Sequence, residues 1–459
     1  MADPVPSTPP VTGESMPHSR LMERARCLTV LAALWLAVLA FGCTPEGDGG
    51  GAGTGADAQG DPGAPSSGDL GMSEADAGDA MAAPMADARP IPRDMGPAAP
   101  ADMGIAPPAD IGAPAPADMG SVAPRRPRLF IIAGQSNAEG NAFYTGLQQL
   151  ANGLPAGNDP LSPQQRQAAR QLIAESQGGW CSPEDFRENT ADTVIDHLRS
   201  TALDWRRLDL AYRHPTVRIR ARQYDYAPVG IQMADGRDVL RCDDCDDPAC
   251  DFSPADGTLV GPALNMYTDD RLSPLAVGFG IAEDPEEGKS YGPELSFGHA
   301  IGETYEDAIV FKMAMGGSSL GDHWRLDGPM YQTLIEGIEQ ALTEHDATLG
   351  GFVWFQGFND QFENAYCDPL TPLYQGNLRR FLESVREDLA TPVPMVIVKA
   401  RNSGNLFEIQ EAQDAVAAAL DGVETVETSD TSECFHYDSG AQIVIGERIA
   451  AAMVELLAR

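Results

Sequence analysis

The chain has 459 residues and a formal net charge of −37, with acidic residues in every part of it. This balance excludes nucleic acid and anionic membrane surfaces as partners, since both are bound through basic patches. The length would allow two or three domains. The composition instead predicts one folded domain, residues 128–459, behind two N-terminal segments that do not fold as domains.

The N-terminus has the pattern of an export signal. Three arginines precede an apolar run over residues 27–42, which is short for a membrane span and suits a signal sequence. Residues 40–43, AFGC, resemble a bacterial lipobox with Cys43 as the lipidated residue. We predict a signal over residues 1–43, with a true start at Met16 or Met22. The protein is then exported as an envelope lipoprotein; simple secretion or an uncleaved anchor are the alternatives.

Residues 44–127 form a low-complexity segment. From 44 to 124 it has no aromatic residue, no Lys and no Cys, and it is dominated by Ala, Gly, Pro and Asp. Such a composition cannot bury enough apolar surface to offset the entropy of ordering. An Asp-Met-Gly or Asp-Ile-Gly triplet recurs every eight residues from Asp94 to Gly120, a unit too small and too Pro-rich to stack. The segment is predicted to be a disordered stalk.

The folded domain begins with residues 129–140, LFIIAGQSNAEG. The large apolar residues indicate a buried strand that breaks at Gly134. Ser136 follows, at the carboxyl end of the strand, where open α/β sheets build their sites. The stretch is not a G-x-S-x-G nucleophile elbow, because Ala138 stands where the second Gly belongs. Taken alone, such a serine would be a helix cap.

A long insertion, about residues 149–271, follows without a clear strand–helix rhythm. Residues 163–174 have helical periodicity, and residues 217–221 alternate as a half-exposed strand. Six cysteines follow Cys43 in the chain: Cys181, Cys242, Cys245, Cys250, Cys367 and Cys434. In an exported protein an even number is most simply explained by three disulfides, whose pairing the sequence does not give.

Five aspartates are interleaved with three of these cysteines in residues 242–251, CDDCDDPACD. We interpret the stretch as an acidic loop closed by disulfides. Cys-x2-Cys spacing also occurs in zinc sites, but no further spaced ligand lies nearby. A calcium site is the other alternative, although the EF-hand spacing and its closing Glu are missing.

From residue 291 strands and amphipathic helices alternate regularly. The expected helices are 292–305, 330–344, 373–389, 406–420 and 441–457, and the expected strands are 308–313, 352–355, 395–399 and 423–426. This alternation predicts an α/β domain with a doubly wound, mostly parallel sheet.

The strand ends carry the residues expected to do chemistry. Gly316 and Gly317 follow one strand, and paired glycines let backbone N–H groups approach an oxyanion. Gln356 and Asn359 follow the next strand and offer amide donors. The last turn before the final helix contains Glu433 and His436, an acid and a base that one loop can hold together.

We call these four short stretches blocks; in chain order they contain Ser136, then Gly316 and Gly317, then Gln356 and Asn359, and last Glu433 and His436. Blocks of this kind in this order resemble the SGNH hydrolase superfamily. The sequences around the blocks are similar to its sialate O-acetylesterase and acetylxylan esterase branch. They are GQSNAEG, YGPELSFG, KMAMGGSSLGDHW and WFQG. The resemblance covers about residues 128–148 and 272–459 and implies a flavodoxin-like fold. That branch usually has Gln-Gly-Glu-x-Asp in the third block, where this chain has Phe358 in place of the Glu.

The resemblance implies that Ser136 is the nucleophile and His436 its general base. Glu433 would complete the triad where the family usually has Asp, and Asp430 and Asp438 are alternatives. The oxyanion hole would be formed by the N–H of Ser136, the N–H of Gly317 or Gly316, and the amide of Asn359 or Gln356. No metal or other cofactor is expected.

The predicted function is that of an exported, monomeric serine esterase that removes O-acetyl groups from carbohydrates; its only membrane contact would be the N-terminal lipid anchor. Transfer of the acetyl group to another sugar is a variant of the same chemistry. The alternative from another class is a surface glycan-binding protein on an inactive hydrolase fold. The sequence does not identify the glycan.

Four residues near the blocks have two interpretations each. Trp324 and Tyr291 either line a sugar subsite or, as aromatics more often do, belong to the core. His323 is expected at the surface. Lys399 and Arg401 either meet an acidic substrate group or form structural pairs, and the second is preferred.

Overall fold

A computed structural model describes residues 125–176, 187–240, 245, 253–281, 289–400, 406–432 and 436–459. The principal elements, in chain order, are β1 (Arg128–Gly134), α2 (Ser136–Glu139), β2 (Ala142–Phe143), α3 (Tyr144–Gly153), α4 (Pro163–Glu175), α5 (Glu188–Ser200), η3 (Trp205–Arg207), β3 (Val217–Tyr224), β4 (Gly230–Met233), β5 (Asp238–Leu240), β6 (Gly257–Val260), β7 (Ser273–Pro274), β8 (Ser290–Tyr291), α6 (Glu294–Thr304), β9 (Ala308–Met315), α7 (Pro329–Glu344), β10 (Thr348–Phe355), η5 (Phe358–Gln361), α8 (Thr371–Asp388), β11 (Met395–Val398), α9 (Leu406–Ala419), β12 (Val423–Val426) and α10 (Ser439–Ala458).

The main sheet has seven strands in the order β12-β11-β10-β1-β9-β3-β7. All neighbouring pairs are parallel except β3 and β7, which are antiparallel. With β3 and β7 set aside, the remaining strands have the flavodoxin-like order 2-1-3-4-5. The predicted mostly parallel α/β sheet is therefore confirmed. The chain switches sides at β1, between β9 and β10, and at such a switch the strand ends leave room for a site.

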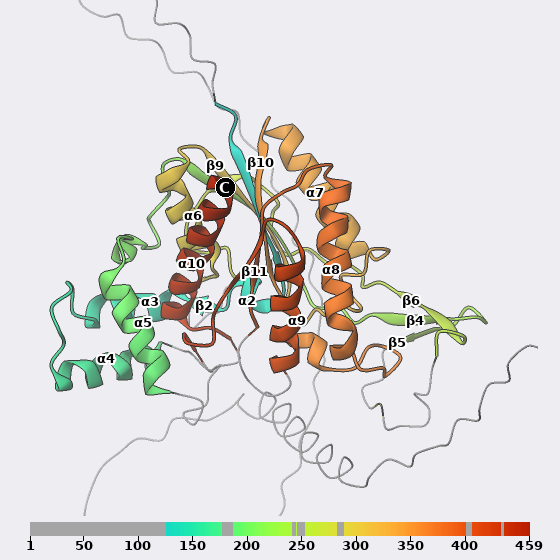
Figure 1. Cartoon of the computed structure of the whole chain (residues 1–459), viewed down its shortest axis with the longest axis horizontal. Helices are drawn as coiled ribbons and strands as arrows, with labels where there is room; N and C mark the ends of the chain where they lie inside the picture. Colours follow the sequence, from blue (N-terminus) through green and yellow to red (C-terminus); the bar gives the residue numbers. More distant parts are fainter. Residues whose placement is uncertain are drawn as a thin grey trace, which may run out of the picture. The chain divides into compact units, whose positions relative to one another are not determined.

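Two apolar cores lie on the two faces of the sheet (Figure 1). Phe130 and Ile132 point to one face, where α3, α6 and α10 cover them. Leu129 and Ile131 point to the other face, under α7, α8 and α9. Because side chains alternate along a strand, the continuous apolar run of β1 is explained by burial on both faces.

A three-stranded antiparallel sheet, in the order β5-β4-β6, forms a satellite of the domain. Among the described residues, its apolar cluster has three that are fully buried, Val229, Ile231 and Ala365. A disulfide between Cys245 and Cys367 joins this region to the segment after η5. A disulfide-bonded Cys245 cannot act as a thiolate ligand, which agrees with the preferred interpretation of this stretch as a disulfide-closed loop rather than a zinc site.

The strands and helices predicted from residue 291 onward are all present, with ends shifted by a few residues. The predicted helix near 163–174 is α4. The strand predicted at 217–221 is also present, but it is more buried than the expected half-exposed strand. Arg220 is only 4% exposed, and its charge is compensated by ion pairs with Asp270 and Glu344. Helices α3 and α5 were not predicted.

Several predictions fall outside the described residues. They concern the export signal with Cys43, the stalk, and the cysteines Cys181, Cys242, Cys250 and Cys434. Among the helices that the structure describes, none is both long enough and apolar enough to cross a bilayer.

Candidate active site

Ser136 lies at the carboxyl edge of the sheet, immediately after β1. Gly134 has φ of 156°, and a Cβ at this position would lie 2.1 Å from the carbonyl oxygen of Phe355. Gln135 N then donates to that same oxygen at 3.2 Å. The glycine therefore lets β1 turn closely against the end of β10. This turn places Ser136 at the first position of α2, where it is 8% exposed.

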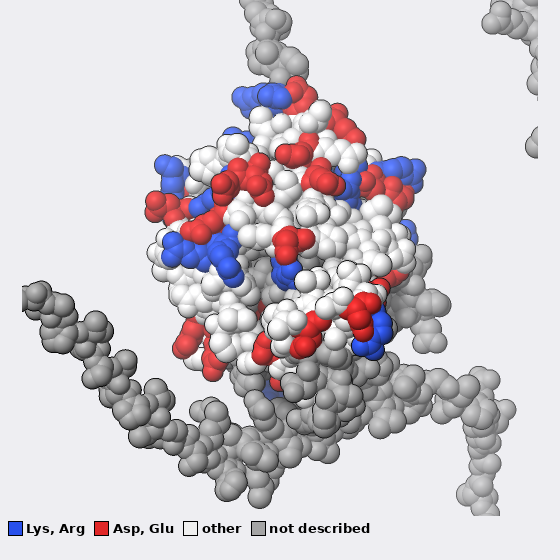
Figure 2. Space-filling model, turned by 90° about the vertical axis from the view of Figure 1, so that its right-hand side faces the viewer, with Lys and Arg blue, Asp and Glu red and all other residues white. Residues whose placement is uncertain are grey.

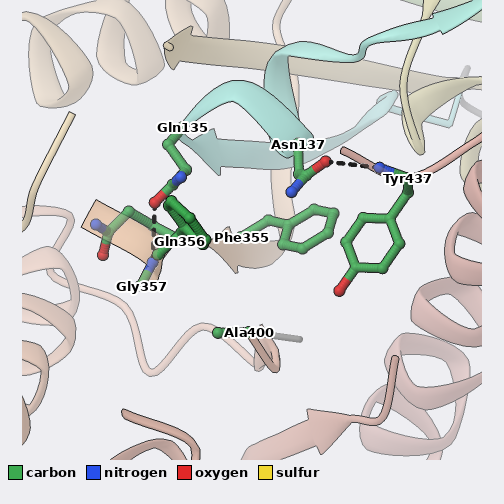
Figure 3. Close-up of a pocket in the computed structure, with 8 residues that line it drawn as sticks. Gln135, Asn137, Phe355, Gln356, Gly357, Ala400 and Tyr437 are labelled. Carbon is green, nitrogen blue, oxygen red and sulfur yellow. Dashed lines mark hydrogen bonds between the residues drawn. The ribbon is translucent and has the colours of Figure 1, made fainter. Parts of the chain in front are cut away.

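The start of α10 is hydrogen bonded to the Ser136 turn through Asn137. The Oδ1 of Asn137 accepts from Tyr437 N at 3.2 Å, as Figure 3 shows. The carbonyl oxygen of Asn137 accepts from the Gln442 amide at 3.3 Å. These bonds join the neighbour of Ser136 to the neighbour of His436. The structure thus brings the predicted nucleophile and base to one place, although they are 300 residues apart in the chain. Asn137 was not identified from the sequence as the residue that joins them.

The predicted oxyanion glycines lie beside Ser136, at the end of β9. A Cβ on Gly316 would lie 3.8 Å from the Cβ of Ser136 and 2.8 Å from the Glu139 carboxylate. That carboxylate accepts a backbone hydrogen bond from Gly316. Gly317 has φ of 74°, in the left-handed region that favours glycine. Of the two, Gly316 therefore already has its N–H engaged.

The two candidate amides differ in their hydrogen bonds. Gln356 is 2% exposed, and its amide nitrogen donates to Ser318 O at 3.2 Å and to Asp360 Oδ2 at 2.6 Å. A carboxamide has two N–H donors, so these two bonds use both. Asn359 is only partly buried, and its amide donates to the carbonyl oxygen of Gly317. The Asn359 amide is therefore the better placed of the two to take part in an oxyanion hole.

Gln135 couples the Ser136 turn to the turn after β10. Its Oε1 accepts from Gly357 N at 3.1 Å (Figure 3). Its amide donates to Asn359 Oδ1 at 3.3 Å. Next to it lies a cavity of about 20 Å³, lined by Gln135, Asn137, Phe355, Gln356, Gly357, Phe358, Ala400 and Tyr437. A cavity of this size has room for roughly one water molecule.

A buried charged network lies under the Ser136 turn. Lys312, in the middle of β9, is fully buried and pairs with the equally buried Glu294 at 2.8 Å. Its ammonium also donates to Glu139 O at 2.5 Å and to Phe279 O at 2.6 Å. Burial lowers the pKa of Lys312, against the attraction of Glu294. A lysine in an otherwise apolar strand was the sequence signal for this network, and it was not used.

The carboxyl group of Glu139 is enclosed on the side of Ser136 that faces β9. Burial raises its pKa, while hydrogen bonds from the hydroxyl of Tyr267 and the backbone of Gly316 act in the opposite direction. Tyr267 belongs to the region predicted as an insertion, so this contact links that region to the edge of the site.

Asp360 holds the turn that follows β9. Its carboxylate accepts from Leu320 N at 2.8 Å and from Gly321 N at 3.0 Å, besides the Gln356 amide. Burial raises its pKa to about 7, because the hydrogen bonds only partly offset the loss of hydration. The block Gln356 to Asp360 thus fixes the glycine turn from below.

The three candidate acids of the triad have different placements. Glu433 lies outside the described residues. Both carboxylate oxygens of Asp430 accept from Arg448, at 2.6 and 2.8 Å. Asp438 caps α10, with Oδ1 accepting from Ala441 N at 2.9 Å.

Trp324 and Tyr291 are both fully buried, which confirms the core interpretation. His323 was expected at the surface, and this is wrong: it is 2% exposed, and its Nδ1 accepts from Ser319 N at 3.1 Å. The buried backbone N–H of Ser319 requires an acceptor, which explains why the imidazole ring of His323 points inward. Lys399 pairs with Asp414 and Glu427, as preferred, and Arg401 lies outside the described residues.

Part of the chain matches a known protein family. Residues 269–455 match the family model described as carbohydrate esterase, sialic acid-specific acetylesterase. The chain is a carboxylic ester hydrolase that resembles sialate O-acetylesterases. The predicted resemblance and the predicted enzyme class are thereby confirmed. The matched residues include the glycine turn, Asn359 and His436, whereas Ser136 precedes them.

No curated protein matches the sequence. Among solved structures, a protein from Arabidopsis thaliana is 15% identical with a TM-score of 0.38, over 72% of this chain and 99% of that one. NanS is 13% identical with a TM-score of 0.39, over 73% and 99%. A carbohydrate acetylesterase from Xanthomonas citri is 12% identical with a TM-score of 0.36, over 72% of this chain and 56% of its own length.

Proposed function

We propose that the protein is an exported serine esterase that removes O-acetyl groups from carbohydrates by a Ser-His-acid mechanism. The observation that carries the proposal is the Asn137 bridge, which holds the Ser136 turn against the residue after His436. Ser136 is also adjacent to a glycine turn whose backbone approaches it closely. A nucleophile, a base and oxyanion donors in one place are the parts that acyl transfer requires.

In the proposed reaction, His436 takes the proton of Ser136 as its Oγ attacks the acetyl carbonyl. The oxyanion that forms accepts hydrogen bonds from the N–H groups of Ser136 and Gly317 and from the amide of Asn359. The C–O bond to the sugar then breaks, and His436 returns the proton to the leaving sugar oxygen. Water, deprotonated by His436, releases acetate from the acetyl-enzyme and restores Ser136.

Glu433 is our proposed third member of the triad, with Asp438 as the alternative. Asp430 is the weaker candidate, since Arg448 already occupies both of its oxygens. A carboxylate in this role orients the imidazole and stabilises its charged form.

The organisation of the chain is part of the proposal. We assign residues 1–43 to an export signal with lipidation at Cys43, residues 44–127 to a stalk, and residues 128–459 to the esterase domain, with an insertion at about 149–271. The partner of the protein is an acetylated carbohydrate, and the protein acts as a monomer.

On the face drawn in Figure 2, Lys and Arg are interspersed with Asp and Glu over the described residues. This arrangement supports the exclusion of nucleic acid as a partner.

The decisive experiment measures acetate release from 4-nitrophenyl acetate and acetylated xylan by the full chain and by Ser136→Ala and His436→Gln. We expect both variants to lose at least about a thousandfold in kcat. Ser200→Ala is the matched control, because this serine lies at the end of α5 and bonds only within its own helix. A folded parent that releases no acetate would refute the esterase and favour a glycan-binding role.

Export and lipidation are tested separately. The full chain, expressed in a bacterial host, should incorporate labelled palmitate and sediment with the membrane fraction, and Cys43→Ser should abolish both. Equal labelling of the parent and the variant would contradict the assignment of Cys43.

A further inference from the structure

Tyr226 is an exposed aromatic residue next to the glycine turn. It follows β3 and is 50% exposed, whereas Trp324 and Tyr291, the two aromatic candidates from the sequence for sugar contact, are fully buried. Of the exposed large apolar side chains in the described residues, only Tyr226 and Phe407 are aromatic. A single exposed aromatic residue is ordinary by itself, so it is the position of the Tyr226 ring that points to a role.

The ring of Tyr226 lies directly against Gly317. A Cβ on Gly317 would lie 2.8 Å from Cδ2 and 3.1 Å from Cε2 of the ring. The glycine therefore leaves the space that the ring occupies. Next to Gly317, the Cβ position of Gly316 is 3.8 Å from the Cβ of Ser136. The aromatic ring is thus one residue away from the backbone that borders the proposed nucleophile.

The rest of the ring's surroundings hold it in place. The imidazole of His323 lies with its centroid 5.7 Å from that of Tyr226, and His323 is itself fixed by Ser319 N. On the main chain, Asp225 N donates to Asn265 O at 3.0 Å, next to the bridge between Tyr224 and Met266. One part of the ring is therefore supported by protein and the rest is open to solvent.

The cavity on the other flank of Ser136 cannot take a sugar. Its volume of about 20 Å³ is sufficient for roughly one water. The sugar ring of the substrate therefore has to lie outside this cavity.

We infer that Tyr226 forms a sugar subsite, in which the ring of the acetylated carbohydrate stacks on the exposed face of the phenol. The C–H groups of a sugar ring carry partial positive charge and are attracted to the negative face of an aromatic ring. The phenol hydroxyl can also donate to a sugar hydroxyl. This inference rests on the proposed function and deepens it. Tyr226 lies outside residues 269–455, the part that matches the family model.

The experiment compares two esters. Tyr226→Ala should lower kcat/KM about tenfold on acetylated xylo-oligosaccharides, which corresponds to the loss of one aromatic contact. On ethyl acetate, which has no ring to stack, the same variant should remain within about twofold of the parent. Tyr226→Phe should retain most of the sugar activity. Leu210→Ala, an exposed apolar residue before the amino end of β3, should change neither.

A binding measurement separates this inference from the esterase itself. Calorimetric titration of Ser136→Ala with xylo-oligosaccharide should show about tenfold tighter binding than Ser136→Ala/Tyr226→Ala, whether or not the parent hydrolyses esters. Unchanged affinity would overturn the subsite. An equal loss on both esters would overturn it too, since Tyr226 would then only support Gly317. A parent that hydrolyses neither ester but shows the affinity difference would refute the esterase alone.

Discussion

The two turns that meet at Ser136 are held by opposite kinds of charge. Under the Ser136 turn, the buried ammonium of Lys312 donates to the carbonyl oxygens of Glu139 and Phe279 and is neutralised by Glu294. Under the glycine turn, the buried carboxyl of Asp360 accepts from two backbone N–H groups and one amide. A cation thus organises carbonyl groups on one side of the site, and a carboxylate organises N–H groups on the other.

The two supports differ in how their charge is compensated. Lys312 has a carboxylate partner, and the pair is neutral as a whole. Asp360 has only neutral donors in these contacts, and its pKa rises to about 7. Burial of an unpaired charge costs more than burial of a pair. The comparison therefore predicts that the first turn depends on both members of a pair, whereas the second responds to pH.

Lys312→Met should have the largest effect. The substitution leaves Glu294 buried without its charged partner, so we expect a loss of about 3–5 kcal/mol in unfolding free energy. The carbonyl oxygens of Glu139 and Phe279 each lose one donor and keep the Gln223 amide. Urea unfolding measures the loss of stability. Lys312→Met/Glu294→Met removes the stranded charge and should recover part of the loss. A single variant within about 1 kcal/mol of the parent would show that the pair does not support the turn.

Asp360→Asn should change the pH dependence of stability. The folded pKa of about 7 lies above the ordinary aspartate pKa of 3.8, so between these values the folded state binds a proton that the unfolded state has lost. Stability therefore falls as pH rises from about 4 to about 7, by a few kcal/mol at most, and levels off above. Asn cannot ionise, so the difference between parent and variant should follow this slope. A pH-independent difference in urea midpoints would contradict the raised pKa.

The regular half of the fold could be predicted because its signal is local. From Glu294 onward, each helix has an apolar stripe and each strand a short apolar run, and burial on both faces of a parallel sheet requires this pattern. The glycine turn, Asn359 and His436 could be singled out as candidates because each follows a strand, and the carboxyl ends of parallel strands share one edge.

The rest depends on contacts that the sequence does not encode locally. Tyr226 reaches Gly317 only because β3 pairs with β9, and nothing in residues 217–224 names that partner. His323 was placed at the surface because a histidine is usually polar and accessible, yet the turn at Ser319 needs its Nδ1. Similarly, α5 has a polar composition and is held by packing against α10. Such cases depend on tertiary context.

Gln135→Ala should have an intermediate effect. It removes the acceptor of Gly357 N and the donor to Asn359, which link the Ser136 turn to the third block. We expect a loss of about 1–2 kcal/mol in unfolding free energy, since one buried N–H loses its partner. The activity should fall about tenfold or more through kcat, because Asn359 loses its support. A change in KM alone would indicate that Gln135 contacts substrate instead.

Asp430→Asn should have the smallest effect, and it tests a charge pair of a third kind. Asp430 and Arg448 are partly exposed, with side chains 45% and 26% accessible, so solvent screens their attraction. We expect less than about 1 kcal/mol of lost stability. The kcat should stay within about twofold of the parent, because Arg448 rather than His436 binds both oxygens of this carboxylate.

The corresponding Glu433→Gln should lower kcat by orders of magnitude if Glu433 orients the base. If Asp430→Asn instead shows the large loss and Glu433→Gln does not, Asp430 is the acid and must leave Arg448 during the reaction.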